Sequence, residues 1–233
     1  MTGKNAASIG TIASILFASV VASAQEPAAT PPAAAAPKAA APVTEGGTDH
    51  ESVVGHVGAT IFPTTAIPLP MGTATAPVVG VRYWLMPNLG IDGGLGVGWF
   101  TGSGVSPFAL AFHAGVPIAL ASSKHFTFII APEADLGFAH VNQPVPMMAN
   151  NTADGLLIDL GGRVGAEIHF GFIGIPQLSL QGSLGLFYTH LEAKTNVAGV
   201  TTTTYQNNLV TGTNNGNNPW AIFTNNIEAT YYL

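Results

Sequence analysis

A strict alternation of apolar and polar side chains, held to the last residue, is the feature that most constrains this chain. In the closing stretch "FTNNIEATYYL", Phe223, Ile227 and Leu233 fall on one side of the alternation, whereas Glu228 and Thr230 fall on the other. A period of two residues places successive side chains on opposite faces of a β-strand. The same period recurs from residue 52 onward, so the sequence predicts an all-β fold.

Eight segments carry this alternation and are separated by turn-rich sequence. The predicted strands cover residues 52–64, 76–86, 88–100, 106–119, 125–141, 155–172, 178–194 and 219–233. Each one reaches the ~9–11 residues that a tilted membrane-spanning strand requires. The predicted fold is therefore an eight-stranded antiparallel up-and-down β-barrel.

The connections between these strands alternate between short and long. Tight turns are predicted at residues 86–88, 121–124 and 174–177, and longer connections at residues 66–76, 101–106, 142–155 and 195–218. This arrangement is typical of outer-membrane barrels, whose short turns face the periplasm and whose long loops face outward.

The two faces of the strands decide between a soluble and a membrane barrel. In the sixth segment Ile158, Leu160 and Val164 share an uncharged, bulky face, whereas Asp159 and Arg163 lie among glycines on the other. Only 8% of the residues are charged, against about 25% in soluble globular chains. Facing water, the bulky face would be a large aggregation-prone patch. The pattern favours a lipid-facing exterior and a narrow polar lumen, with a soluble periplasmic ligand-binding barrel as a distant alternative.

The N-terminus has the pattern of an export signal. Lys4 precedes an apolar run from Ile9 to Val21, and Ala22-Ser23-Ala24 has the form of a cleavage site, which predicts a cleaved signal peptide over residues 1–24. A membrane anchor is the alternative. Residues 25–51, rich in Ala and Pro, are predicted to be an extended periplasmic spacer, either passive or tethered to the cell wall. Residues 52–233 then form the barrel, in the outer membrane of a Gram-negative cell envelope.

Aromatic residues are expected near both ends of the strands, as two interfacial girdles. The set near the turn end is Tyr83, Phe126, Phe172 and Tyr231, and the set near the loop end is Trp99, Phe108, Phe138 and Tyr188.

Charged residues on the inner face are expected to pair inside the lumen, because an unpaired buried charge is costly. This predicted network comprises Arg82, Asp92, Glu133, Asp135, Asp159, Arg163, Glu167 and Glu228. A three-residue loop at 86–88 would set Leu85 opposite Leu89 and Arg82 opposite Asp92. Arg163 is expected to pair with Glu133 or Asp135.

Three histidines, His56, His113 and His169, also fall on the predicted inner face. They lie at different heights and show no recurring ligand spacing, so the sequence predicts neither a metal site nor another cofactor. The chain contains no cysteine, which excludes disulfides and a lipoprotein anchor. Its acidic excess argues against nucleic acid as a partner.

The chain resembles the small eight-stranded outer-membrane barrels of the OmpA, OmpX and OmpW type over residues 52–233, in architecture and not in a subfamily motif. Ile227, Ala229, Tyr231 and Leu233 resemble the C-terminal signal of such proteins, which usually ends in Phe or Trp. The resemblance implies that the barrel-assembly machinery and outer-membrane lipid are partners.

The sequence points to a structural or surface-recognition role, with the 195–218 loop as the candidate recognition element. A narrow, porin-like cation leak is the runner-up, because six inward acids face two arginines and carboxylates favour cations. No enzyme is predicted: Thr189, His190 and Glu192 lack the serine of a lipid deacylase, and the first two point to opposite faces.

Overall fold

The computed structural model describes residues 47–70, 72–100, 105–144, 150–211 and 226–233. These residues form an all-β structure with antiparallel pairing throughout. Among them, no helix is long and apolar enough to cross a membrane. The predicted signal peptide and the spacer up to residue 46 lie outside the described residues.

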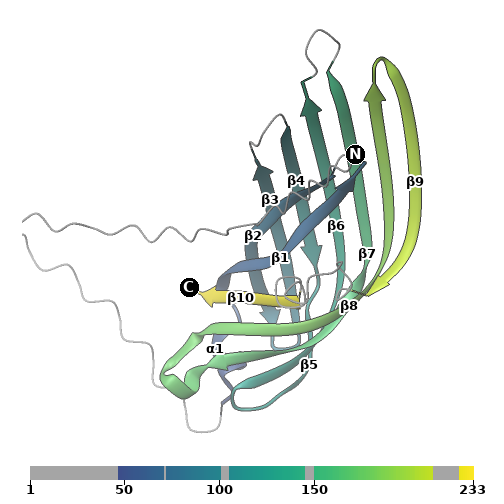
Figure 1. Ribbon diagram of the computed structural model, residues 1–233. Helices are drawn as coiled ribbons and strands as arrows, with labels where there is room; N and C mark the ends of the chain where they lie inside the picture. Colours follow the sequence, from purple (N-terminus) through teal and green to yellow (C-terminus); the bar gives the residue numbers. More distant parts are fainter. Residues whose placement is uncertain (1–46, 71, 101–104, 145–149, 212–225) are drawn as a thin grey trace, which may run out of the picture. The chain divides into compact units, whose positions relative to one another are not determined.

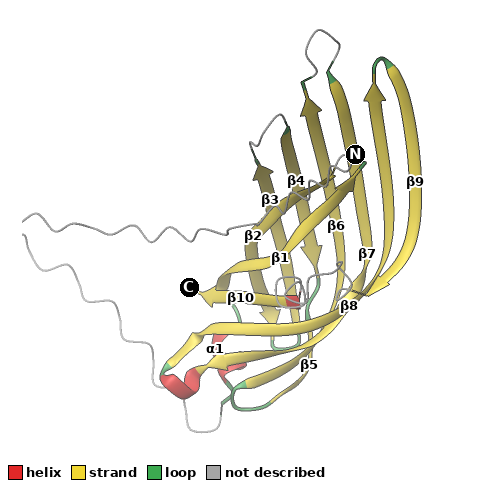
Figure 2. Cartoon of the chain, viewed as in Figure 1, coloured by secondary structure: helices red, strands yellow, loops and turns green. Residues whose placement is uncertain are grey.

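Two short helical segments accompany ten strands in the described chain (Figure 2). Their bounds are α1 Asp49–Val53, β1 Val57–Leu69, β2 Gly72–Met86, β3 Leu89–Trp99, β4 Ser106–Gly115, β5 Ile118–Ser122, β6 Phe126–Gln143, β7 Asn151–Phe170, η1 Gly171–Ile173, β8 Ile175–Val197, β9 Val200–Thr211 and β10 Ile227–Tyr232.

Eight of the strands close into a ring. The order β1-β2-β3-β4-β6-β7-β8 follows the chain, and β10 pairs with both β8 and β1 (Figure 1). The prediction that the last strand pairs with the first is therefore confirmed. Closure leaves no free sheet edge where β10 lies, because each of its edges has a partner.

Side-chain register runs around the whole ring as one continuous line. From β8, direct neighbours lead through each strand to β7 in the order Leu180, Ala229, Ile61, Val79, Leu95, Phe112, Leu136 and Ile158. Ile158 then pairs with His190, so the line returns to β8 ten residues beyond Leu180. With ~3.3 Å per residue and ~4.8 Å between strands, this stagger gives a strand tilt of roughly 40°.

The prediction of a strand from residue 52 is wrong at its start. Residues 49–53 form α1, and β1 begins only at Val57. Thr48 and Glu51 form a capping box in which each side chain bonds the backbone N–H of the other. This local pairing satisfies free N–H groups of the first turn and favours a helix over an extended chain.

Several predicted connections are strand instead of loop. Residues 66–76 are mostly paired, with Leu69 directly opposite Gly72, so this connection is short and the expected alternation of short and long connections fails here.

The predicted strand 106–119 divides into β4 and β5 around residues 116–117, because Pro117 has no N–H to give to the ladder. The last predicted strand, 219–233, is described only from residue 226.

The predicted loop 195–218 is also mostly strand. β8 continues to Val197, Ala198 and Gly199 make a turn with positive φ, and β9 returns along β8 to Thr211. β9 and β10 occupy the same edge of β8 in succession: Leu186 pairs with Thr211, and Gly182 pairs with Ile227. Residues 212–218 of the prediction lie outside the described residues.

The ring interior is filled by two different kinds of cluster. Toward the end of β1, Ile67 and Leu69 cross the interior and contact β6 and β7, where a Cβ at Gly137 or Gly155 would strike them. At the opposite end of the ring, Trp84 and other buried aromatic and charged side chains fill the interior.

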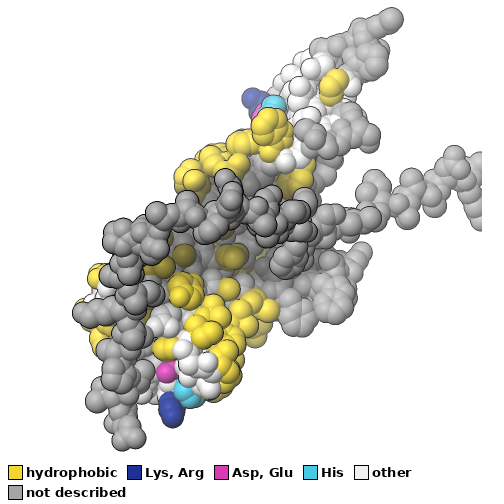
Figure 3. All heavy atoms as spheres, turned by 90° about the vertical axis from the view of Figure 1, so that its left-hand side faces the viewer, with side chains coloured by type: hydrophobic (Ala, Val, Ile, Leu, Met, Phe, Trp, Pro, Cys, Tyr) yellow, Lys and Arg dark blue, Asp and Glu magenta, His cyan; other side chains and the backbone are white. Residues whose placement is uncertain are grey.

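The outward face is apolar. Exposed large side chains occur on every strand of the ring, among them Ile61, Val79, Leu95, Phe112 and Leu184. Figure 3 shows hydrophobic side chains over most of the described surface in that view, with small charged groups near the two ends. Five charged side chains of the ring, Arg82, Asp92, Glu133, Glu167 and Glu228, are instead buried within it, which reverses the arrangement of a water-soluble β-sandwich or barrel.

Candidate functional site

A buried charge network centred on Arg82 occupies the turn end of the ring interior. The Arg82 guanidinium binds Asp92 with two hydrogen bonds, Nε to Oδ1 at 2.8 Å and Nη2 to Oδ2 at 2.7 Å. Nη2 also donates to Glu228 at 2.9 Å, and Nη1 donates to Gln181 at 2.7 Å. The Glu167 carboxylate lies 4.0 Å from Nη1. One cation therefore faces three carboxylates, all of them nearly or completely buried.

A second chain of hydrogen bonds continues from Glu167. Its Oε1 accepts hydrogen bonds from the hydroxyls of Ser179 and Tyr232. The Tyr232 hydroxyl in turn accepts from Trp84 Nε1 at 2.9 Å. Strands β2, β7, β8 and β10 are thereby joined across the interior by side chains alone.

The register around Arg82 confirms one prediction and corrects another. Arg82 is directly opposite Asp92, as predicted. The turn, however, holds only Pro87 and Asn88, and Met86, not Leu85, pairs with Leu89. Leu85 is a one-residue β-bulge, which restores the register that a two-residue turn alone would have shifted.

Farther along the interior, Arg163 Nε donates to Glu133 at 2.7 Å, which confirms the predicted pairing of this arginine. His113 Nδ1 lies 2.7 Å from Asp135 Oδ1. Asp159 is directly opposite Asp135 on β7. These side chains, except Glu133, line part of a cavity of about 270 Å³ bounded by β1, β8 and β9.

Helix α1 closes the turn end of the ring. The Asp49 carboxylate accepts hydrogen bonds from the Gly171 N–H at 3.1 Å and pairs with His125 Nδ1 at 2.6 Å. Its own N–H donates to the Lys124 carbonyl at 2.9 Å. Val53 packs beneath Trp84 in the buried cluster. The helix thus contacts each of the short connections that follow β5 and β7.

His50, on α1, is almost fully buried and contacts two residues of the strand ring, Trp84 on β2 and Pro87 in the turn that follows it. Its Nε2 lies 2.7 Å from the Pro87 carbonyl, and its ring meets Trp84 edge-on at 4.5 Å. Burial lowers the pKa of His50, although the Pro87 carbonyl and the charge of Glu167 act in the opposite direction. Reasoning from the sequence missed this residue, because it fell in the predicted spacer.

Three buried polar atoms in and around His50 have no hydrogen-bond partner among the described residues. They are His50 Nδ1, Glu167 Oε2 and His169 Nε2. One donor atom from each of these residues lies within 4.8 Å of the other two, and Glu167 Oε2 and His169 Nε2 are 3.7 Å apart. Each residue's other polar atom is already engaged: His169 Nδ1, for example, lies 3.3 Å from the Pro176 carbonyl.

The three histidines predicted to face inward have different positions. His113 and His169 are buried inside the ring. His56 is exposed, which contradicts the prediction: it precedes β1, and its Nδ1 lies 2.7 Å from the Leu233 carbonyl. The prediction failed because α1 and its turn replace the strand on which His56 was placed.

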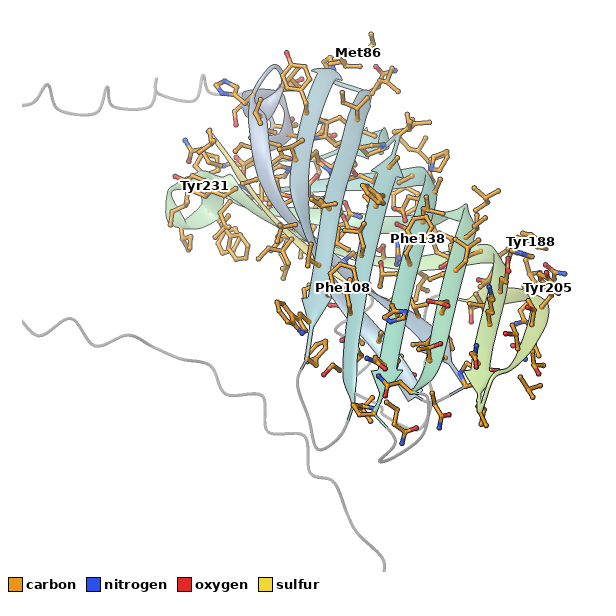
Figure 4. The ribbon with its side chains drawn as sticks, turned by 90° about the horizontal axis from the view of Figure 1, so that it is seen from above. Met86, Phe108, Phe138, Tyr188, Tyr205 and Tyr231 are labelled. Atoms are coloured by element: carbon orange, nitrogen blue, oxygen red, sulfur yellow. The ribbon has the colours of Figure 1, made fainter. Side chains whose placement is uncertain are left out.

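The predicted aromatic sets can be compared by height, which here means position along the axis of the strand ring. After correction for the ten-residue stagger, the strand members of each set fall within about two residues of a common height. The two heights differ by about ten residues, or roughly 25 Å at a tilt near 40°. One set is Trp99, Phe108, Phe138 and Tyr188, and the other is Tyr83, Phe126 and Tyr231 (Figure 4 labels four of these). The last predicted member, Phe172, lies on η1.

The remaining predicted residues are placed as follows. Tyr231 and Leu233 of the predicted assembly signal are exposed, and Ile227 and Ala229 are half-buried, all on the outer side of β10. The Thr189 side chain is buried, whereas the His190 side chain bonds Asn207 outside, so the two side chains do not form a common site.

Neither a scan against protein-family models nor a search of the curated proteins returned a match for this chain.

Proposed function

We propose that this chain is an integral outer-membrane β-barrel of a Gram-negative bacterium, with a side-chain-filled lumen and a structural or surface-recognition role. The observation that carries the proposal is the pair of aromatic heights about 25 Å apart, with an apolar register line running around all eight strands between them. Transmembrane barrels have an apolar band of about 25 Å between two aromatic girdles. The likeness to the OmpA, OmpX and OmpW type remains part of this proposal.

The filled turn end of the interior favours a structural barrel over a channel. Arg82 is held by Asp92 and Glu228, and α1 covers the same end of the ring. An eight-stranded barrel has an interior just wide enough to be filled by side chains. A narrow cation leak would require these ion pairs to rearrange, which is the alternative that the conductance experiment below tests.

The β8–β9 hairpin supports a recognition role. Apart from Val210, all of β9 is exposed, and Asn208, Val210 and Thr211 near its end line the cavity, so the tip of the hairpin projects beyond the packed interior. Its tip lies beyond the aromatic height of Tyr188, the side opposite α1. With α1 on the periplasmic side, the hairpin faces the cell exterior, where the uncharged, Thr- and Asn-containing strand β9 is available for contact.

Three measurements on the full chain test membrane integration and closure. We expect the protein to resist carbonate extraction from outer membranes and, unheated, to migrate faster on SDS gels than after boiling. Inserted in planar bilayers, it should give no discrete current steps. Recovery in the soluble fraction would refute the membrane proposal, whereas cation-selective steps abolished by Glu133→Gln would refute only the closed lumen.

The recognition role is tested by shortening the hairpin. Removing residues 195–202, the tip of the hairpin, leaves Lys194 and Thr203 as a two-residue turn and keeps the register of the β8–β9 pairs from Ala193–Thr204 onward. We expect unchanged assembly and heat-modifiable migration, together with loss of adhesion between cells that display the protein and cells that lack it. Undiminished adhesion by the shortened protein would leave only the structural role.

A further inference from the structure

We propose that His50, Glu167 and His169 bind one divalent transition-metal ion of the zinc class, and that this ion stabilises the contact between α1 and the strand ring. Nothing in the sequence pattern indicated this site, because one ligand comes from α1 and the other two come from β7. Glu167 and His169 share the inner face of β7, two residues apart.

The three donor atoms are poised for a ligand. Within the described part of the chain, His50 Nδ1, Glu167 Oε2 and His169 Nε2 are buried without a hydrogen-bond partner, and the exposed fractions of the three residues are 1%, 0% and 0%. A buried acceptor without a partner loses the hydrogen bonds that water would give it, so three such atoms close together are unfavourable without an occupant. A metal ion would satisfy all three at once.

The second contact of each ligand fixes the required protonation state. If Nε2–H of His50 donates to the Pro87 carbonyl, Nδ1 carries the lone pair; if Nδ1–H of His169 donates to the Pro176 carbonyl, Nε2 does. Glu167 Oε1 is held by two hydroxyl donors, Ser179 and Tyr232. Metal-bound histidines and carboxylates in proteins are oriented by such outer contacts.

The local charge also favours a cation. Arg82 is the one cationic side chain that contacts Asp92, Glu228 and Glu167 among the described residues, so this end of the interior carries an excess of buried negative charge. A divalent ion on Glu167 would offset that excess without disturbing the Arg82–Asp92 pair. Two imidazole nitrogens and one carboxylate oxygen suit zinc and related metals better than Mg²⁺ or Ca²⁺, which prefer oxygen ligands.

The geometry requires only small movements. Zinc takes nitrogen and oxygen ligands at about 2.0–2.2 Å, so donors now within 4.8 Å of one another need to approach the centre by less than about 1 Å. The fourth position of a tetrahedral ion would remain for water. An ion held by His50 of α1 and by two residues of β7 would link the helix directly to the strands. Metal binding would therefore make the docking of α1 tighter.

The test uses the full chain, refolded in detergent and stripped with EDTA, with Zn²⁺ as the probe and Co²⁺ absorption as a second readout. We expect one Zn²⁺ per chain and an affinity lowered about 100-fold or more by either His50→Gln or His169→Gln. His56→Gln is the matched control, because His56 is close in sequence but exposed, and it should bind as the unmodified chain does. The His50 variant lies outside the ring, so heat-modifiable migration should show that its ring is intact.

Hydrogen exchange supplies a readout that a merely structural histidine would not move. Zn²⁺ should slow amide exchange of residues 49–53 in the unmodified chain and have no effect in His169→Gln. The proposal is overturned if no saturable Zn²⁺ binding occurs, as expected when Glu167 and His169 instead share a proton. It is equally overturned if both histidine variants bind Zn²⁺ as tightly as the unmodified chain.

Discussion

Arg82 and Asp92 form a two-pronged ion pair directly across β2 and β3, with N–O distances of 2.8 and 2.7 Å and almost no exposure of either side chain. Replacing Arg82 by Met removes the cation and leaves three buried carboxylates close together. We expect a loss of about 3–5 kcal/mol in unfolding free energy, the range for breaking a buried ion pair.

Urea unfolding of the refolded protein, followed by tryptophan fluorescence, measures this loss. Lys194→Met is the matched control because Lys194 is exposed near the hairpin tip, and its effect should be small. In the double variant with Asp92→Asn, the losses should be less than additive. Strictly additive losses would show that the two side chains act independently.

The Tyr232 hydroxyl links Trp84 to Glu167 inside the ring. Tyr232→Phe should lower the unfolding free energy by about 1–3 kcal/mol, because it leaves the buried Trp84 N–H without its acceptor. The neighbouring Tyr231→Phe is the control, since Tyr231 points outward and is half-exposed. Equal effects of the two substitutions in the same unfolding assay would contradict this assignment of inner and outer faces.

Leu95 lies midway between the two aromatic heights on the outer face. If this face contacts lipid, Leu95→Arg should reduce the unfolding free energy in lipid vesicles by about 2–4 kcal/mol, the cost of arginine at the middle of a bilayer. Val200→Arg, at the exposed turn of the β8–β9 hairpin, should change it little. A tolerated charge at Leu95 would argue that the outer face meets water.

Gly171 lies against the Asp49 carboxylate, and a Cβ at this glycine would fall on that carboxylate. Gly171→Ala should displace Asp49, break its bonds to His125 and the Gly171 N–H, and undock α1 without disturbing the ring. Cleavage after Glu51 by a glutamyl protease should become faster, while heat-modifiable migration stays the same. Gly182→Ala is the control because its Cβ would meet nothing within 4 Å, and faster cleavage in that variant too would refute the steric explanation.

Much of the strand ring follows from the sequence because each strand needs only local information. The two-residue period identified eight strands, the inward position of Arg82 and Asp92, and their pairing. The strands beside the predicted connections 66–76, 142–155 and 195–218 were predicted too short, since polar residues such as those of 200–211 pair as readily through backbone as apolar ones do. The prediction from turn length that Leu85 faces Leu89 was also wrong, because a bulge at Leu85 compensated for the shorter turn.

The sequence by itself determined the faces of the strands, because alternation of side chains is a property of a single strand. Only the tertiary structure decided which inward groups meet. Closure of the ring with a ten-residue stagger brings Arg82 of β2 to Glu228 of β10, and the folding of α1 onto the turns brings His50 to Glu167 and His169. These contacts depend on the sum of all registers around the ring and on the docking of a helix, neither of which is encoded at any one position.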